Sequence, residues 1–326
     1  MNRTLLLKNI RESKWLLLAC AAAIFSFCWV RVWLVSRLDT DQFRTILEML
    51  PSDWKKFVPI DMEFMITFPG RISLVYNEPI VVFGVTIWAI ARGSDCVSGE
   101  LNRGTLEMLL AQPLSRLQVL VSQSLVTVVG VGLLAATAWL GTWVGVQTNY
   151  AKETIRPAWS LPIPLPWIGS QIPKPGAKPE TRRVPMSTKV DAAVFVPATA
   201  NLFSLGFFLA GLTTLVSASD RYRWRTIGIV VGIYIVQTIF KIIALADVGF
   251  EWLRFGTVLT AYNPEKFVQI AVQTPELTWS LSRYDAAGRF VELGPLGYDL
   301  VLIGLGGIAF AAAARIFCRR DLPAPL

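Results

Sequence analysis

Long apolar segments alternate with shorter polar ones along the whole chain. Six segments of 17 to 31 residues are almost entirely apolar, at 15–36, 72–91, 117–147, 193–218, 226–246 and 298–314. Runs of about 18 or more apolar residues are typical of helices that cross a membrane. A helix also pairs its own backbone groups, which lipid requires. The pattern therefore predicts an all-α polytopic membrane protein with six transmembrane helices, forming a single domain over residues 1–326.

The three longest polar segments, 37–71, 148–192 and 247–297, lie on the same side of the predicted membrane. In the first, helical spacing of apolar side chains predicts a surface helix that carries Phe43, Ile46, Leu47 and Leu50. The second has eight prolines, a density that predicts an extended excursion without helix or sheet, either a docking arm or a tolerated insertion. The third predicts one or two short helices around Asn263-Pro264.

Composition agrees with a membrane protein. Apolar residues make up 53% of the 326 positions and charged residues 17%, which excludes a single soluble globule and a disordered chain. The net charge is +8, but the basic residues gather at the ends of the apolar segments. That placement indicates membrane orientation and disfavours nucleic-acid binding. Bulky residues follow the small ones inside 15–36, so we expect an uncleaved first helix there.

The distribution of lysine and arginine predicts the orientation. With the N-terminus inside, the inner segments 1–14, 92–116, 219–225 and 315–326 carry 13 basic residues in 58 positions. The outer segments carry 16 in 131, and long loops count for little in this rule. Both termini are therefore predicted to be cytoplasmic.

The chain has no histidine and four cysteines without metal-like spacing. This excludes serine–histidine and cysteine–histidine nucleophile pairs and argues against a metal site or a disulfide framework. We expect neither a cofactor nor a metal, and an intramembrane enzyme is disfavoured. Four charged residues lie near the outer ends of the spans and act either as interfacial anchors or along a translocation path: Glu78, Lys241, Asp247 and Asp299.

The inner loop 98–116 carries a short helix between a start signal and a stop signal. Thr105 is placed to cap it, Glu107 lies in its first turn, and Pro113 ends it before Arg116 opens the next span. Three leucines form one apolar face, namely Leu106, Leu109 and Leu110. The physical pattern alone leaves two alternatives: the helix either transmits force from a soluble partner or packs on its own bundle.

This loop resembles the cytoplasmic signature of type-2 permeases of ATP-binding-cassette (ABC) transporters. The matching stretch has an acidic residue, then Gly-Thr-Leu-Glu, a Leu-Leu pair and Pro-Leu-Ser-Arg, and the six-span layout agrees. The resemblance implies a coupling helix that inserts into an ATPase subunit, with these site residues: Glu100, Gly104, Thr105, Leu106, Glu107, Leu109, Leu110, Pro113 and Arg116. It also implies that Arg3–Lys14 forms a connecting helix along the inner membrane surface. Where many relatives carry Gly-Lys, this chain has Ser122-Gln123.

Two further features bear on partners. The chain contains no phosphate-binding loop, so it is predicted to be no enzyme itself and to take its energy from a separate ATP-binding cassette ATPase subunit. The resemblance implies a dimer with a second permease copy or a homologue. Small-residue pairs at Gly141/Gly145 and Gly307/Ala311 would permit close helix approach, either within one bundle or between copies.

The sequence therefore predicts the membrane permease subunit of an ABC exporter in the inner (plasma) membrane of a prokaryote, working by alternating access in the lipid bilayer. The alternative is a non-transporting scaffold that anchors a soluble complex through the same loop. On the first hypothesis, Glu107→Lys or Gly104→Pro uncouples ATP hydrolysis from transport without preventing insertion.

Overall fold

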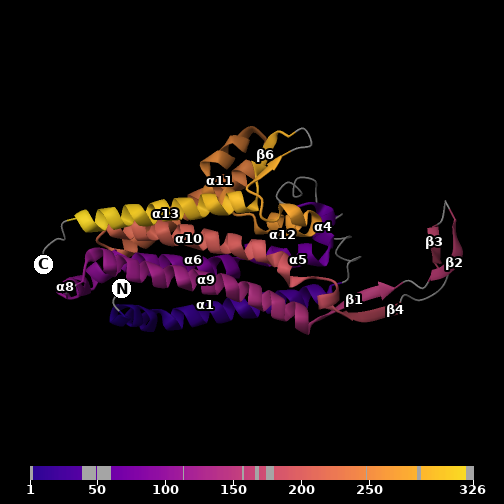
Figure 1. Cartoon of the computed structure of the whole chain (residues 1–326), viewed down its shortest axis with the longest axis horizontal. Helices are drawn as coiled ribbons and strands as arrows, with labels where there is room; N and C mark the ends of the chain where they lie inside the picture. The colour runs from indigo at the N-terminus through magenta and orange to yellow at the C-terminus, as the bar shows by residue number, and fades with distance from the viewer. Residues whose placement is uncertain are drawn as a thin grey trace.

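Six long apolar helices run side by side in the computed structural model of the chain (Figure 1). The structure describes residues 3–38, 49, 60–112, 114–155, 158–165, 169–173, 180–246, 248–284 and 288–320. Each of the six is long and apolar enough to cross a membrane, which confirms the predicted fold class. They comprise α1 (Arg3–Arg37), the segment Phe68–Asn102, α9 (Arg116–Thr148), the segment Ala192–Ser219, α11 (Arg223–Ala246) and α13 (Pro295–Arg319).

Two of the six are built from several pieces. The second combines α5 (Phe68–Ser73), η1 (Leu74–Asn77), α6 (Pro79–Ser94), the π-helical turn η2 (Asp95–Gly99) and α7 (Glu100–Asn102). The fourth combines the 3₁₀ turn η4 (Ala192–Phe195) with α10 (Val196–Ser219). Shorter helices and turns lie between the spans: α4 (Met62–Ile66), α8 (Thr105–Leu110), η3 (Met186–Thr188), η5 (Val248–Gly256), η6 (Val258–Ala261), α12 (Pro264–Gln273) and η7 (Pro275–Leu277).

The first helix is longer than predicted. α1 runs from Arg3 to Arg37 without a break, about 52 Å at 1.5 Å per residue, against a hydrocarbon core of about 30 Å. The stretch Arg3–Lys14 is thus not a separate helix, and the predicted connecting helix along the membrane surface is wrong. Leu5, Asn9 and Ser13, one helical turn apart, are buried against the bundle instead.

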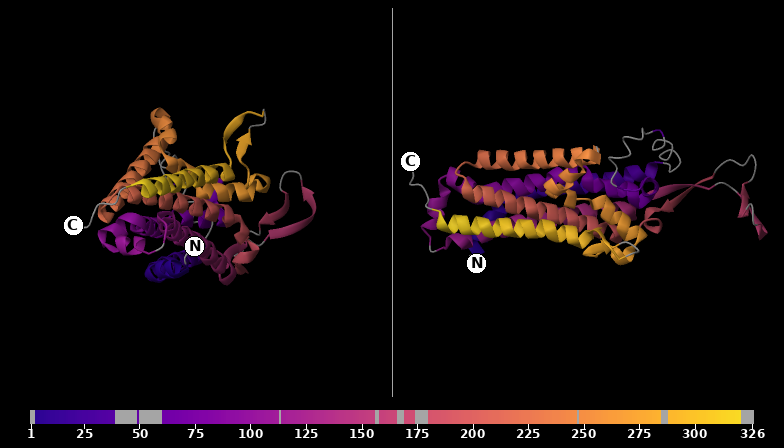
Figure 2. Two further views of the ribbon diagram at one scale, coloured as in Figure 1. Left: turned by 60° about the vertical axis from the view of Figure 1, so that its left-hand side comes forward. Right: turned by 90° about the horizontal axis from the view of Figure 1, so that it is seen from above.

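The core lies where α6, α9 and α10 meet. Trp88 of α6 is fully buried, and its indole N–H donates to the backbone oxygen of Thr127 on α9 at 2.9 Å. α10 packs between α13 and α6, whereas α11 lies at the periphery, as Figures 1 and 2 show. Only 11% of the most apolar stretch of α11 is buried inside the molecule, so most of this helix is free to face lipid.

The small-residue pair in α9 serves packing within the chain. A Cβ added at Gly141 would lie 2.7 Å from the backbone oxygen of Phe25, and one at Gly145 2.7 Å from Cβ of Val32. Both glycines therefore allow α1 to pack closely against α9. This confirms, for this pair, the alternative of packing within one bundle. Gly307 of α13 has no atom within 4 Å of an added Cβ among the described residues, so its face stays open.

Charged residues near the outer span ends have partners inside the molecule. Glu78 lies 3.7 Å from Arg31, and the Lys241 ammonium donates to the Tyr262 backbone oxygen at 2.7 Å. Asp299 is buried and accepts a hydrogen bond from the Asn201 amide at 2.8 Å. A carboxylate at that depth is stabilised by a hydrogen bond from the neighbouring helix. Asp247 lies outside the described residues.

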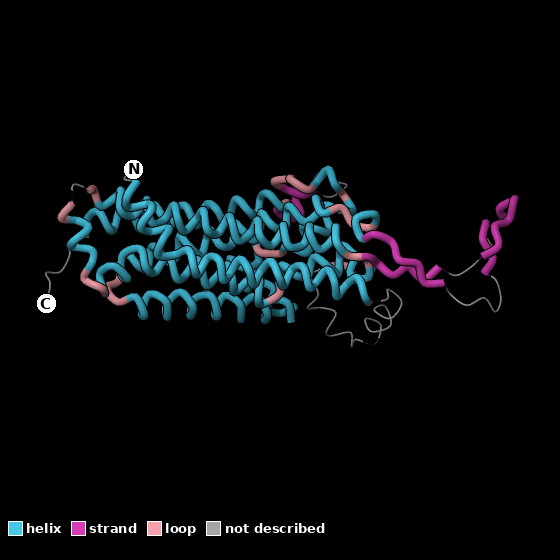
Figure 3. The backbone as a smooth tube through the Cα atoms, turned by 90° about the horizontal axis from the view of Figure 1, so that it is seen from below, coloured by secondary structure: helices cyan, strands magenta, loops and turns pink. Residues whose placement is uncertain are grey.

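A β-ribbon extends from the bundle at the end opposite the start of α1 and the end of α13 (Figures 1 and 3). Its strands are β1 (Tyr150–Ile155) paired with β4 (Glu180–Pro185), and β2 (Ala158–Leu165) paired with β3 (Gly169–Pro173), all antiparallel. The extended backbone agrees with the sequence, but the exclusion of a sheet was wrong. In β2 the ladder is interrupted between Ser160 and Leu165, where Pro162 and Pro164 lie, so neither proline has to donate.

The remaining predicted loop elements can be placed in part. α12 begins at Pro264, as the Asn263-Pro264 signal predicts, with proline in the first turn where its missing N–H is harmless. A hairpin of β5 (Ser282–Tyr284) and β6 (Phe290–Leu293) follows it and was not foreseen. The surface helix predicted to carry Phe43, Ile46, Leu47 and Leu50 lies outside the described residues.

Candidate coupling site

The loop between the second and third spans is a compact turn of helix at the end of the bundle where α1 begins (Figure 1). It comprises α7, a turn at Arg103-Gly104, and α8. Gly104 has φ +70°, a left-handed conformation that glycine adopts without strain. The chain thereby turns sharply between α7 and α8.

Thr105 does not cap α8 as the sequence predicted. It is the first residue of the helix, since the Gly104 turn already supplies the change of direction. Its hydroxyl instead points to Glu100, with one contact to the backbone oxygen at 3.3 Å and a second to Oε2 of the carboxylate. Thr105 thus ties the start of α8 back to α7.

The leucine face of α8 is buried in its own bundle. Leu106 is 1% exposed and packs in a cluster with Cys96, Leu120 and Phe317, while Leu109 packs with Leu5 of α1. These leucines therefore anchor the loop, as in the second alternative left open by the sequence. Pro113 and the side chains of Glu107 and Leu110 lie outside the described residues.

The opposite side of the loop is exposed. Met108 is 72% exposed, although apolar residues of this kind are usually buried. It belongs to an exposed surface, here called the loop rim, made of Asn102, Arg103, Gly104, Met108, Ala111 and Gln112. Any soluble protein that contacts this loop therefore meets the rim and not Leu106 or Leu109.

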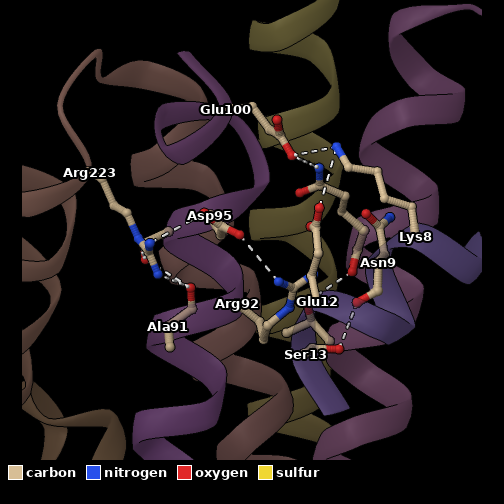
Figure 4. Close-up of polar contacts among 12 residues, drawn as sticks. Lys8, Asn9, Glu12, Ser13, Ala91, Arg92, Asp95, Glu100 and Arg223 are labelled. Carbon is tan, nitrogen blue, oxygen red and sulfur yellow. Dashed lines mark hydrogen bonds and ion pairs between the residues drawn. The ribbon is translucent and has the colours of Figure 1, made fainter. Parts of the chain in front are cut away.

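The carboxylate of Asp95, in the π-helical turn, forms ion pairs with three arginines, of which Arg92 and Arg223 are labelled in Figure 4. Asp95 lies 2.6 Å from Nη1 of Arg103 in the loop, 3.2 Å from Arg92 one turn earlier, and 3.5 Å from Arg223 at the start of α11. A π-helical turn holds one extra residue, and such turns occur frequently at functional sites. Asp95 thus links the coupling loop to two membrane helices.

Glu100 is the second buried carboxylate of the site. It is 1% exposed, and its Oε1 lies 3.5 Å from the Lys8 ammonium of α1 and 3.4 Å from Arg103. Gln123 of α9, at the position where many relatives of the resembled family carry lysine, donates to the same oxygen at 3.4 Å. Glu100 thus joins α1, the loop and α9, with Lys8 and Arg103 as its cationic partners.

Hydrogen bonds from the π-helical turn to α10 hold the turn in place. The Ser217 hydroxyl accepts from the backbone N–H groups of Val97 (3.1 Å) and Ser98 (2.9 Å). Ser98 also hydrogen-bonds to Thr226 of α11 at 3.1 Å. Sequence reasoning missed these residues, since serines inside an apolar helix carry no distinctive pattern.

Arg116 contacts the end of α13. Its guanidinium donates to the backbone oxygens of Phe317 (3.3 Å) and Arg320 (2.6 Å), which are carbonyls left free at the end of α13. α9 itself starts with a capping box between Ser115 and Gln118. Arg116 therefore joins the start of α9 to the end of α13 and has no contact with Glu100 or Asp95 among the described residues.

The neighbouring inner loop is fixed by Asp220. Burial alone would raise the pKa of this carboxyl, but the backbone N–H groups of Tyr222 and Arg221 and the Arg225 guanidinium outweigh it and lower the pKa below its ordinary value. Arg225 Nε lies 2.6 Å from Asp220 Oδ2. This pair resembles the Asp95 cluster in chemistry but makes no contact with the coupling loop in the described part of the chain.

Neither metal nor nucleophile chemistry is indicated by the geometry. The four cysteines are free thiols, and no group of three or more metal-ligating side chains occurs among the described residues. The site is instead an exposed loop that contacts four membrane helices through salt bridges and leucine packing.

Comparison with known proteins identifies a family for this arrangement. A family model described as "ABC-2 family transporter protein" matches residues 7–322, nearly the whole chain. No curated protein matches the chain.

Proposed function

The chain belongs to the ABC-2 transporter family, and we propose that it couples ATP hydrolysis by a separate cassette ATPase to export of a substrate across the membrane. As a member of this family it is a permease subunit, a component of a membrane transporter and not itself a catalytic enzyme. The observation that carries the proposal is the 2.6 Å contact between Arg103 of the loop and Asp95 at the end of the second span.

In this mechanism the ATPase binds the loop rim. Met108 provides an exposed apolar contact, and the leucines on the other side keep the loop rigid, so a push on the rim moves the whole turn. Arg103 passes the motion to Asp95, and Asp95 passes it to Arg92 of α6 and Arg223 of α11. Through Glu100 and Lys8 the same motion reaches α1.

Such a linkage suits alternating access. α11 is the least buried of the six long helices, so it can shift against lipid with little loss of internal packing. α10 and α13, by contrast, approach so closely that a Cβ at Gly211 would lie 2.4 Å from the backbone oxygen of Gly306. We therefore assign the moving part to α11 and the static part to α10 and α13, while α1 moves only together with α9, against which Gly141 and Gly145 pack it closely.

We further propose that the loop, the start of α1 and the end of α13 are cytoplasmic in a prokaryotic plasma membrane. The excess of basic residues in the inner segments supports this orientation, and the start of α1 and the end of α13 lie at the same end of the bundle, which agrees with an even number of spans (Figure 3). The working unit is proposed to contain two permeases and two ATPases. The open face of α13 at Gly307 offers room for a second copy.

The decisive experiment identifies the ATPase that co-purifies with the chain and measures transport and ATP hydrolysis together in proteoliposomes. Met108→Asp places a charge on the loop rim and is expected to abolish transport and ATPase co-purification while the chain stays inserted. Phe255→Asp is the matched control, because Phe255 is 96% exposed in η5, which follows the far end of α11.

Two results would contradict the proposal. If Met108→Asp transports normally with its ATPase bound, the loop rim is not the coupling surface. If the chain recruits its partner but supports no transport with any substrate tested, the scaffold alternative holds instead.

A further inference from the structure

The three arginines around Asp95 line a cavity. Its volume is about 390 Å³, and it lies between α1, α6, the loop and α11, lined by Glu12, Ser13, Leu16, Ala91, Arg92, Asp95, Arg103 and Arg223. One water takes about 30 Å³ of liquid volume, so the space greatly exceeds what a single water needs. Figure 4 labels Glu12, Ser13, Arg92, Asp95 and Arg223, polar lining residues that come from three separate membrane helices.

The charges of this cavity do not cancel. Asp95 is the shared partner of Arg92, Arg103 and Arg223, and one carboxylate cannot neutralise three guanidinium groups. The other acidic lining residue, Glu12, is partly exposed and lies 3.7 Å from Lys8. With Lys8 and Glu100 included, the cluster still carries one positive charge in excess. An anion is therefore the ligand that the cavity favours.

One donor in the wall has no internal partner. The side chain of Arg92 is 7% exposed, and its Nε is buried without a hydrogen-bond partner among the described residues. A buried guanidinium N–H left unpaired is unfavourable, and a phosphate oxygen would satisfy it. Arginine is also the side chain best suited to phosphate, because its donors form a planar fork.

The depth of the cavity is that of lipid headgroups. Trp15 and Trp224 are 72% and 70% exposed, and each directly adjoins a lining residue, Leu16 on α1 and Arg223 on α11. Exposed tryptophans in membrane helices are typical of the interface between headgroups and hydrocarbon. Both α1 and α11 thus carry an exposed tryptophan, typical of the membrane interface, next to a residue that lines the cavity.

An apolar track leads from the cavity into the hydrocarbon region. On α6, Phe83 and Ile87 are 51% and 53% exposed, and Ala91, which lines the cavity, follows at the same four-residue spacing. Residues four apart lie on one face of a helix. A molecule with a phosphate at Arg92 could therefore lay an acyl chain along Ile87 and Phe83.

We propose that this cavity binds the phosphate headgroup of an anionic phospholipid from the leaflet at the loop end of the bundle. The lipid would sit against the Asp95 cluster and so stabilise the junction between the loop, α6 and α11. The proposal is independent of which substrate is transported, and its test measures lipid binding alone, so its failure would leave the proposed function standing.

The test uses the purified full chain in neutral detergent, with phosphatidylglycerol and phosphatidylcholine offered in equal amounts and bound lipid counted by native mass spectrometry. Wild type is expected to retain phosphatidylglycerol selectively. Arg223→Gln should lower that retention about tenfold, the effect of losing one charge-assisted hydrogen bond. Arg225→Gln is the matched control on the same helix, since Arg225 pairs with Asp220 away from the cavity.

A second pair of variants tests the space without changing charge. Leu16→Trp fills the cavity and should also lower phosphatidylglycerol retention, whereas Leu18→Trp, on the exposed side of α1, should not. The thermal unfolding midpoint of each variant without added lipid shows that it is folded.

Three outcomes would overturn the proposal. The first is equal retention of the two lipids by wild type, and the second is unchanged phosphatidylglycerol retention in both cavity variants. The third is displacement of the lipid by excess inorganic phosphate, which would make soluble phosphate the ligand.

Discussion

Arg103 and Asp95 form the shortest ion pair among the described side chains of the loop, with 2.6 Å between Nη1 and Oδ1. Arg103 belongs to the turn between α7 and α8, while Asp95 belongs to the π-helical end of the second span. Ion pairs that are also hydrogen bonds have a narrow geometry, so they transmit displacement better than apolar contacts do. In the proposed mechanism, the pair is the point where a movement of the loop becomes a movement of the membrane helices.

Asp95→Asn should break this relay. The substitution leaves the buried Arg92 and the partly buried Arg223 without their carboxylate, and breaking a buried pair destabilises by about 3 kcal/mol. We expect a lower thermal unfolding midpoint and a loss of transport that exceeds the loss of ATP hydrolysis. The ratio of the two rates in proteoliposomes measures this uncoupling.

Asp220→Asn is the matched control for that experiment. Asp220 is also buried and ion-paired at 2.6 Å, but with Arg225 outside the coupling loop. The Asp220→Asn variant should be less stable than wild type but keep the wild-type ratio of transport to ATP hydrolysis. Equal ratios in both variants would argue against Asp95 as the relay.

Leu106 and Met108, two residues apart on α8, should separate anchoring from partner binding. Leu106 is 1% exposed, so Leu106→Ala creates a cavity and should destabilise the loop end of the bundle by about 2–5 kcal/mol. Met108→Ala changes an exposed residue and should alter stability by less than about 0.5 kcal/mol while weakening ATPase association. Thermal unfolding and quantitative ATPase co-purification measure the two effects. A stable Leu106→Ala together with an unstable Met108→Ala would reverse the assigned faces.

The six spans could be predicted from sequence because each is a long apolar run. Whether a run is long enough to cross a membrane depends on local composition alone. The turn at η2 could not, because its extra residue is held by Ser217, 120 positions away from Val97. The cap at Thr105 was predicted wrongly because Gly104, with φ +70°, already turns the chain. The contact between Lys8 and Glu100 depends on how α1 packs along the loop, which composition does not encode.

The stability of the inner end should depend on pH through Asp220. Its folded pKa lies below the ordinary value of 3.8, so the ionised carboxylate stabilises the fold. That contribution is fully present above pH 3.8 and disappears as the pH falls through the folded pKa. Wild type should therefore unfold at a higher temperature than Asp220→Asn at pH 6, as measured in detergent, with the difference shrinking below about pH 4. A difference that stays constant down to pH 3 would show that the carboxylate charge plays no part.

Gly130 should be intolerant of any side chain. A Cβ at this position would lie 2.1 Å from the Trp88 ring, and that ring is fully buried and bonded through its N–H to Thr127. Because the indole cannot withdraw without losing this bond, Gly130→Ala forces α6 and α9 apart, and overpacking of this kind destabilises by about 1–3 kcal/mol.

Gly132→Ala, two residues further along α9, is the matched control for Gly130→Ala. Its added Cβ would meet Phe203 at 3.7 Å, an ordinary contact, and alanine favours a helix over glycine by about 1 kcal/mol. Thermal unfolding in detergent should therefore show a lower midpoint for Gly130→Ala and an unchanged or higher one for Gly132→Ala. Because both variants make the same chemical change in the same helix, similar midpoints would mean that α6 and α9 do not meet at Trp88. The route proposed from Asp95 along α6 would then lack the rigid packing it requires.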